Sequence, residues 1–239
     1  MTTPRVAVCV PCNGESHAQM LPSVMTNMMS QQLKPAEVSV SISGIGQEMY
    51  DEVIAKCHSI LTDIQLITCH STLPILEAKN RNTAVANTSS DIDIISFRDA
   101  DDDFRSDWLY RTSQLLQEYN ADMCLIGFVL PPRPHPRPGV TRNKWRQNVP
   151  IKIITPEEIK KICGEWLYGP LPIKPLAHGW CTFKRYVFDN IKFDESVTSR
   201  RGRGIDCRFV RQVIQDHPVV YTSEQLGVYN IELSSYKNQ

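Results

Sequence analysis

Short apolar runs rich in β-branched residues alternate with helical patterns through the first part of the chain. The strand-like runs cover residues 5–10, 37–43 and 63–69, and a fourth begins at Ile92. Helical patterns follow these runs at residues 17–33, 50–60, 75–86 and 108–119. Strands that alternate with helices form parallel sheets whose two faces the helices cover. The alternation therefore predicts an α/β fold with a mostly parallel central sheet and helices on both faces.

Length, charge and cysteine usage limit the class of protein. A chain of 239 residues can form one sizeable domain without disulfides. Its formal net charge is +0 at pH 7, so no overall field attracts it to nucleic acid or to an anionic membrane. No apolar run is long enough for a membrane span, and the eight cysteines are scattered. We therefore expect reduced thiols in a cytoplasmic protein; the C-x-x-C pair of Cys9 and Cys12 is read as structural or, alternatively, as a metal or redox site.

Four carboxylates follow the fourth apolar run within five positions, at Asp99, Asp101, Asp102 and Asp103. Like charges at this density repel one another unless a cation or solvent compensates them. Carboxylate oxygens are preferred ligands of Mg²⁺ and Mn²⁺, which hold phosphate-bearing substrates. Because ligands of open α/β sheets bind beyond the carboxyl ends of the strands, Asp99 and Asp101 are predicted metal ligands. The alternative is an acidic turn in which Asp102 or Asp103 caps the helix that begins near Ser106.

The later part of the chain has a different texture. Residues 131–139 are rich in proline and lead into a basic stretch at 142–146, and such a loop is either functional or simply solvated. A helix is predicted at residues 203–215. Two short strands, at 219–222 and 226–231, are predicted to close the fold.

Four blocks, in order along the chain, resemble the inverting glycosyltransferases of family 2, which have the nucleotide-sugar-dependent A-type fold. The first three, Val8-Cys9-Val10-Pro11-Cys12-Asn13-Gly14-Glu15, Ala78-Lys79-Asn80-Arg81-Asn82 and Ile95-Ser96-Phe97-Arg98-Asp99-Ala100-Asp101-Asp102, are similar to the motifs Pro-x-Asn-x-Glu, Ala-Arg-Asn-x-Gly and Asp-x-Asp-Asp. The fourth is diffuse: His178-Gly179-Trp180, Phe193-Asp194-Glu195 and Gly204-Ile205-Asp206. It resembles the acceptor-side segment of galactosyltransferase-like members.

The resemblance implies one Rossmann-like nucleotide-diphospho-sugar transferase domain over residues 1–239. Residues 1–104 would form the nucleotide-sugar-binding half and residues 105–239 the acceptor-binding half. The implied activity is metal-dependent, inverting transfer of a hexosyl or pentosyl group from a nucleoside diphosphate sugar, with a UDP-sugar favoured. A glycan or another hydroxyl compound would accept the sugar, and Mn²⁺ or Mg²⁺ would be the cofactor.

The resemblance also assigns roles to individual residues. The nucleotide sugar would be bound by Pro11, Asn13, Glu15, Ser43, Lys79, Asn80, Asp99 and Ala100. The metal would be held by Asp99, Asp101 and Asn230, with His217 as the alternative to Asn230. Asp206 would be the general base, and the acceptor would be bound by His178, Trp180 and Arg203.

Two departures from the family pattern keep other functions in view. The second strand ends in Ser41-Ile42-Ser43-Gly44 where the family has acids, and Ile205 replaces a glutamate before Asp206. A non-catalytic sugar-binding module of the same fold is therefore one alternative. A sugar nucleotidyltransferase is another, although the loop after the first strand lacks the glycine-rich, basic character that such an enzyme needs. The identity of the sugar and of the acceptor is left open.

Overall fold

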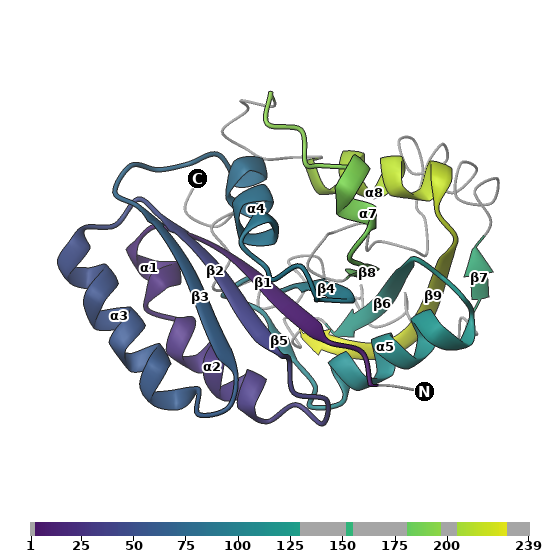
Figure 1. Ribbon diagram of the computed structural model, residues 1–239, viewed down its shortest axis with the longest axis horizontal. Helices are drawn as coiled ribbons and strands as arrows, with labels where there is room; N and C mark the ends of the chain where they lie inside the picture. The colour runs from purple at the N-terminus through teal and green to yellow at the C-terminus, as the bar shows by residue number, and fades with distance from the viewer. Residues whose placement is uncertain (1–2, 130–151, 155–180, 197–204, 229–239) are drawn as a thin grey trace, which may run out of the picture.

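One mixed β-sheet runs through residues 3–129, 152–154, 181–196 and 205–228, which are the residues that this computed structural model describes (Figure 1). Within these ranges the sheet has nine strands. They are β1 (Val6–Asn13), β2 (Glu37–Ser43), β3 (Gln65–Ser71), β4 (Ile94–Phe97), β5 (Asp103–Phe104), β6 (Met123–Val129), β7 (Lys152–Ile154), β8 (Cys181–Lys184) and β9 (Val219–Val228). Their order is β3-β2-β1-β4-β8-β6-β9-β5, and β7 pairs with β9.

The sheet has a parallel part and a mixed part. Strands β3, β2, β1 and β4 are parallel neighbours, as expected for strands joined by helical crossovers. Strand β8 lies antiparallel between β4 and β6, while β6 and β9 are parallel to each other. Most strands therefore point the same way, and the predicted α/β fold with a mostly parallel sheet is confirmed.

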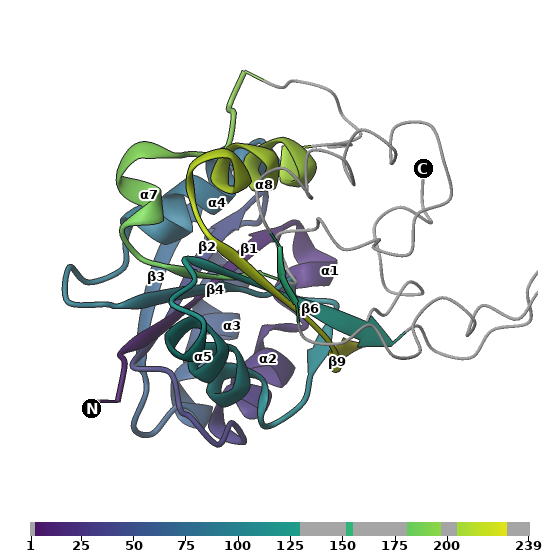
Figure 2. The ribbon, with the colours of Figure 1, turned by 90° about the vertical axis from the view of Figure 1, so that its right-hand side faces the viewer.

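Helices cover both faces of this sheet. They are α1 (Glu15–Ala18), α2 (Leu21–Met29), α3 (Gln47–Ile60), α4 (Glu77–Ala86), α5 (Trp108–Glu118), α7 (Val187–Asn190) and α8 (Ile205–Asp216). Figure 2 shows α4, α7 and α8 above the sheet and α2, α3 and α5 below it. Within the described ranges, no helix has both the length and the apolar character that crossing a bilayer requires.

Alternation along β1 supplies both hydrophobic cores. Val8 and Val10 pack in the core under α2, α3 and α5, whereas Ala7 and Cys9 pack in the core under α4, α7 and α8. Cys12 belongs to the first core and Cys9 to the second, so the C-x-x-C thiols face opposite sides of the sheet. Burial raises the pKa of both thiols, that of Cys12 to about 12. This arrangement identifies them as packing residues and not as a joint metal or redox pair.

Three predicted elements differ from the structure. The helix expected at residues 17–33 is divided into α1 and α2, because Pro22 occupies the first turn of α2 and has no N–H to donate to α1. Gly14 takes the N-cap position of α1. The two strands expected at 219–222 and 226–231 belong to one strand, β9, which pairs with β6 at residues 219–221 and again from Gln225 to Val228, on either side of an irregularity in register; residues 229–231 lie outside the described ranges.

Strand β1 also continues past Pro11 to Asn13, although a strand end was predicted at Pro11. The backbone N–H of Arg98 donates to the Cys9 carbonyl at 3.1 Å, so alternate β1 residues turn their polar groups toward β4. The pairing of β1 with β4 ends at Cys9, whereas its pairing with β2 continues to Asn13. The missing N–H of Pro11 therefore points to a side where no strand needs it.

Candidate functional site

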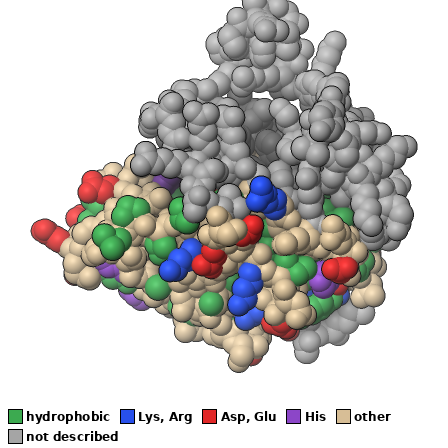
Figure 3. Space-filling view, turned by 90° about the horizontal axis from the view of Figure 1, so that it is seen from above, with side chains coloured by type: hydrophobic (Ala, Val, Ile, Leu, Met, Phe, Trp, Pro, Cys, Tyr) green, Lys and Arg blue, Asp and Glu red, His purple; other side chains and the backbone are tan. Residues whose placement is uncertain are grey.

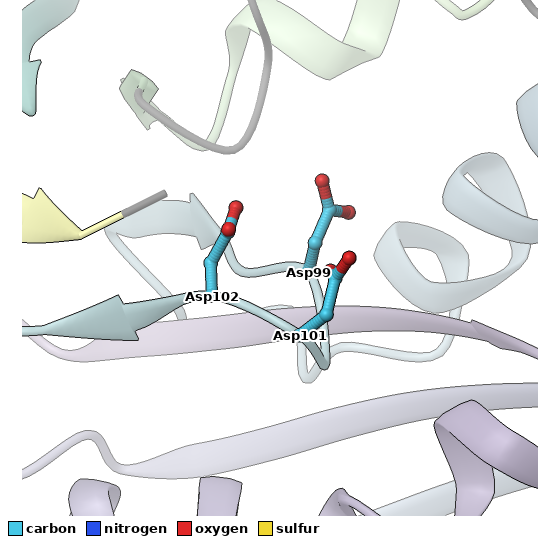
Figure 4. Close-up of side chains that lie close together, drawn as sticks. All are labelled: Asp99, Asp101 and Asp102. Atoms are coloured by element: carbon cyan, nitrogen blue, oxygen red, sulfur yellow. The ribbon is translucent and has the colours of Figure 1, made fainter. Parts of the chain in front are cut away.

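The acidic stretch forms a loop directly beyond the carboxyl end of β4. Its backbone turns back on itself, with the Asp102 N–H donating to the Asp99 carbonyl at 3.3 Å. One carboxylate oxygen from each of Asp99, Asp101 and Asp102 lies within 4.8 Å of the others. The three side chains project to the same side of the loop (Figure 4). The sequence prediction named Asp99 and Asp101, and Asp102 joins them in this cluster.

Burial and electrostatic crowding within the cluster both affect the pKa of Asp101. Burial raises the pKa of this carboxyl, the charge of Asp99 raises it further, and His17 opposes both effects. A divalent cation would offset the same repulsion, and carboxylate oxygens are ligands that Mg²⁺ and Mn²⁺ prefer. The donor set of Asp99, Asp101 and Asp102 therefore fits such an ion.

Arg81 on α4 connects this cluster to a carboxylate on a distant part of the chain. Its side chain is 3% exposed, and its Nη2 lies 3.7 Å from Asp99 Oδ1 and 3.8 Å from Asp206 Oδ1. Its Nη1 lies 2.5 Å from Glu77 Oε1, one helical turn earlier. Burial alone would lower the pKa of Arg81, but Asp206, Glu77 and Asp99 together raise it. The result is a buried cation held by three acids.

Arg81 is the site residue that sequence reasoning missed. The motif comparison favoured Lys79, because Lys79 matches the basic position of Ala-Arg-Asn-x-Gly. In the structure Lys79 is exposed on α4, whereas Arg81 is buried and reaches the acids. The available signal was the spacing of Glu77 and Arg81, which places opposite charges on one face of a helix.

Asp206 lies in the first turn of α8, and an aromatic stack holds that turn near β4. Phe209, one turn further along α8, stacks on Phe193 with ring centroids 4.0 Å apart. Phe193 in turn contacts Phe97, the last residue of β4, edge to face at 5.5 Å. The Arg81 guanidinium lies 5.7 Å from the centre of the Phe193 ring. Packing therefore brings Asp206 to the same edge of the sheet as the acid cluster.

Asn82 fixes the segment that carries Phe193. Its amide group donates to the Phe193 carbonyl at 2.9 Å and to Glu195 Oε1 at 2.8 Å. Its side-chain oxygen accepts from the Phe193 N–H at 3.0 Å. The family motif has glycine at this position, so these three bonds belong to this chain's own side chain.

The carboxyl ends of β1 and β2 form the neighbouring corner of the site. Asn13 and Glu15 are exposed there, and Pro11 is half-buried. Ser43 is buried, and its hydroxyl lies 3.3 Å from Asn13 Oδ1. Asn80 is also buried and donates to the Cys12 carbonyl at 2.9 Å. Ser43 and Asn80 therefore lie behind Asn13 as supports for the end of β1.

A glycine at the end of β2 allows this corner to close. Gly44 adopts a φ of +74°, which is in the left-handed region, and a Cβ built on it would lie 3.1 Å from Asn13 Oδ1. Gly44 therefore serves both the turn and the close approach of Asn13.

The remaining predicted site residues divide into placed and unplaced ones. Ala100 is buried in the loop after β4, between Asp99 and Asp101. Four residues lie outside the described ranges, as does the proline-rich basic loop: His178, Trp180, Arg203 and Asn230.

The structure places His217, the alternative metal ligand, away from the acid cluster. Its Nδ1 lies 2.9 Å from Asp122 Oδ2, directly before β6 begins. Lys184, which also contacts Asp122 at 3.2 Å, pairs with Ile94, the first residue of β4. His217 therefore lies at the amino end of β4, whereas the acid cluster lies beyond its carboxyl end.

Comparisons with known proteins identify the fold. No protein-family model matches the chain, and a search of curated proteins finds no match. Among solved structures, S. aureus TarS residues 1–349 in complex with UDP has a TM-score of 0.67 at 14% identity, covering 94% of this chain and 60% of that one. The mannosyltransferase PcManGT from Pyrobaculum calidifontis, in complex with GDP-Man and Mn²⁺, has a TM-score of 0.63 at 15% identity, covering 99% and 60%. The chain thus spans about 60% of the length of these two chains, and 36% of the longer TarS chain, and it shares their A-type glycosyltransferase fold, as predicted.

Proposed function

We propose that this chain is a metal-dependent, inverting glycosyltransferase, similar to family 2, that takes a nucleoside diphosphate sugar as donor. A UDP-sugar is the favoured donor, and a hydroxyl group of a glycan or another compound is the acceptor. The observation that carries the proposal is the position of Arg81, whose single Nη2 lies near both Asp99 and Asp206. One buried cation thus joins the carboxylates suited to a metal with a carboxylate suited to proton transfer.

The donor would bind at the carboxyl ends of β1, β2 and β4. Asp99 and Asp101 would hold Mn²⁺ or Mg²⁺, with Asn230 proposed as a further ligand. When bound, the ion would supply positive charge against the negative charge that develops on the diphosphate leaving group. Pro11, Asn13 and Glu15 would contact the base and ribose, and Lys79 the diphosphate.

Asp206 would act as the general base. In the proposed step its carboxylate accepts the proton of the acceptor hydroxyl while that oxygen forms a bond to the anomeric carbon. The bond from the anomeric carbon to the diphosphate oxygen breaks on the opposite face, and the configuration inverts. Arg81 would keep Asp206 in place, since its Nη2 lies 3.8 Å from Asp206 Oδ1.

The acceptor would bind near Asp206, and His178, Trp180 and Arg203 are proposed to contact it. On the face that Figure 3 shows, acidic and basic side chains of the described residues lie next to one another. This mixed surface is compatible with a carbohydrate acceptor, whose recognition depends on local hydrogen bonds and aromatic faces. The TarS structures with UDP and with UDP-GlcNAc, and the GDP-Man complex of the mannosyltransferase, support a nucleotide sugar as donor.

Thermal unfolding with a panel of nucleoside diphosphates, each with and without Mn²⁺, tests the donor site. A ligand that binds only the folded protein raises the unfolding midpoint. We expect a rise with one diphosphate that requires the metal and disappears in Asp101→Ala. Asp51→Asn is the matched control, because Asp51 is an exposed acid on α3. The absence of any metal-dependent rise would refute the donor site.

Turnover tests the base. We expect slow hydrolysis, in the presence of Mn²⁺, of the nucleotide sugar whose diphosphate raises the unfolding midpoint. Proton NMR should show that the inverted anomer of the free sugar appears first. Asp206→Asn should keep the metal-dependent rise in midpoint and lose turnover. Metal-dependent binding without any turnover by the wild-type chain would instead identify a non-catalytic sugar-binding module.

A further inference from the structure

Polar side chains at the end of α2 contact the acid loop, which we define as residues 98–105. Asn27 touches this loop on both sides of the carboxylate cluster. Its Oδ1 accepts from Arg98 Nη1 at 2.5 Å, and its Nδ2 donates to the Phe104 carbonyl at 2.9 Å. One amide side chain therefore joins the first residue of the loop to a residue near its end.

Gln31, one turn beyond Asn27, extends this contact to the residues that follow the cluster. It is 3% exposed, its Nε2 donates to the Arg105 carbonyl at 2.9 Å, and its Oε1 accepts from the Leu109 N–H at 3.3 Å. Hydrogen bonds buried in this way are costly to leave unmade, so they restrict the backbone to one arrangement.

Arg98 is the partner of Asn27 and is itself 1% exposed. Its guanidinium lies 5.4 Å from the centre of the Phe104 ring, and its Nη2 lies 3.5 Å from Asp103 Oδ1. Burial lowers the pKa of Arg98 to about 10, against the opposing charges of Asp103 and Asp102, so the group stays cationic at neutral pH. A buried positive charge thus stands directly beside the crowded carboxylates.

These contacts oppose the electrostatic repulsion among the carboxylates of the acid loop. Three carboxylate oxygens within 4.8 Å repel one another, and a loop free at both ends would move them apart. Because Arg98 and Phe104 are tied to the same side chain, the residues between them are held together before any cation arrives. Groups that orient metal ligands in this way commonly control affinity for the ion.

We propose that Asn27, acting with Arg98 and Gln31, is a positioning residue that preorganises Asp99, Asp101 and Asp102 to bind a divalent cation. The proposal rests on the metal-binding part of the proposed function. It does not depend on which nucleotide sugar is used or on whether transfer takes place.

Binding of Mn²⁺ alone, followed by the loss of the free Mn²⁺ signal in electron paramagnetic resonance, is the test. We compare wild type with Asn27→Ala, Asn27→Asp, Asp101→Ala and the control Thr26→Ala. Thr26 is the exposed neighbour of Asn27 on α2, and its hydroxyl donates within its own helix, to the Pro22 carbonyl at 3.0 Å. Thermal unfolding in EDTA shows that each variant is folded.

We expect Thr26→Ala to bind Mn²⁺ like wild type and Asn27→Ala to bind it about 10- to 100-fold more weakly. Asn27→Asp keeps the acceptor for Arg98 and loses the donor to Phe104, so its affinity should fall between these two. If Asn27→Ala does not fold, a loss of about threefold or more in Asn27→Asp decides in favour of the proposal.

Any of three results would overturn this role for Asn27. The first is that folded Asn27→Ala binds Mn²⁺ with an affinity less than about threefold below that of wild type. If Asn27→Ala does not fold, the same result for folded Asn27→Asp counts instead. The contacts would then serve stability alone. The second is Asp101→Ala binding as tightly as wild type, and the third is a wild-type chain that takes up no Mn²⁺. If wild type binds Mn²⁺ but no diphosphate, the proposed donor function fails while the assignment of Asn27 stands.

Discussion

Replacement of Arg81 by methionine should destabilise the metal-free protein strongly. Methionine keeps much of the length and apolar contact of arginine but removes the charge that Glu77, Asp99 and Asp206 share. Removing one partner of a buried ion pair costs about 3 to 5 kcal/mol. The Glu77 and Asp99 side chains are 37% and 35% exposed, so water compensates part of the loss. We therefore expect Arg81→Met to lower the free energy of unfolding by about 3 kcal/mol, the lower end of this range.

The measurement is thermal and urea unfolding in EDTA. In a domain of this size each kcal/mol moves the midpoint by about 2 to 4 °C, so Arg81→Met should unfold about 6 to 12 °C below wild type. Lys56→Met is the matched control, because Lys56 forms an i,i+4 pair with Glu52 on α3 in which both side chains are exposed, at 59% and 63%. We expect this control to lose much less stability than Arg81→Met, because solvent screens an exposed ion pair.

Two outcomes would contradict the reasoning about Arg81. The first is a loss of stability in Arg81→Met no larger than in Lys56→Met. The second comes from a double-mutant cycle with Asp206→Asn, which isolates the pairwise contribution. If Arg81→Met cost the same with and without the Asp206 charge, the 3.8 Å contact would carry no energy.

Further predictions concern groups at other positions. The metal-free Asp101→Asn protein should be more stable than wild type at pH 7, because burial and Asp99 raise the pKa of Asp101 and disfavour its ionised form in the folded state. Unfolding in EDTA should show this gain in stability. Unfolding in Mn²⁺ should show that the variant has lost stabilisation by the metal. Asp122→Asn should cost about 2 kcal/mol at pH 7. Burial would raise the pKa of Asp122, but hydrogen bonds from Tyr186, His217 and Lys184 lower it. The stability lost in Asp122→Asn should therefore disappear as the pH falls through the folded pKa of Asp122, below about 4. An unchanged difference between variant and wild type at pH 3 would refute the ion pairs. Asn82→Ala should raise amide hydrogen exchange at Phe193, whose N–H donates to Asn82. Cys12 should resist thiol reagents at pH 8 until the protein unfolds, because burial raises its pKa to about 12.

Much of the fold was predictable because the alternation of strands and helices is written in local sequence. The runs at 37–43 and 63–69 correspond to β2 (Glu37–Ser43) and β3 (Gln65–Ser71) to within two residues. The single strand β9 was not predictable in the same way, since its middle residues are polar and lie at an irregularity between two segments that pair with β6. That pairing is tertiary and leaves little local signal.

The candidate site shows the same division. The position of the acid cluster beyond a buried strand followed from the pattern of residues 92–104. Motif matching by residue type then selected Lys79, whereas helical phase and burial place Arg81 among the acids. His217 was selected by residue type and by its late position in the chain. Sequence position alone does not reveal that the loop before β9 lies at the amino end of β4.

The place of β8 in the sheet has a consequence for the order of folding. Strand β4 has β1 on one side and β8 on the other, and β8 comes from residues 181–184. During synthesis, the edge of β4 that pairs with β8 therefore stays unpaired until more than eighty further residues have been added. A fragment that ends at residue 104 would leave this edge open, and open apolar edges lead to aggregation. Residues 1–104 are thus expected to need the rest of the chain to complete their sheet, and protection from exchange of the β4 amides that face β8 should arise late in refolding.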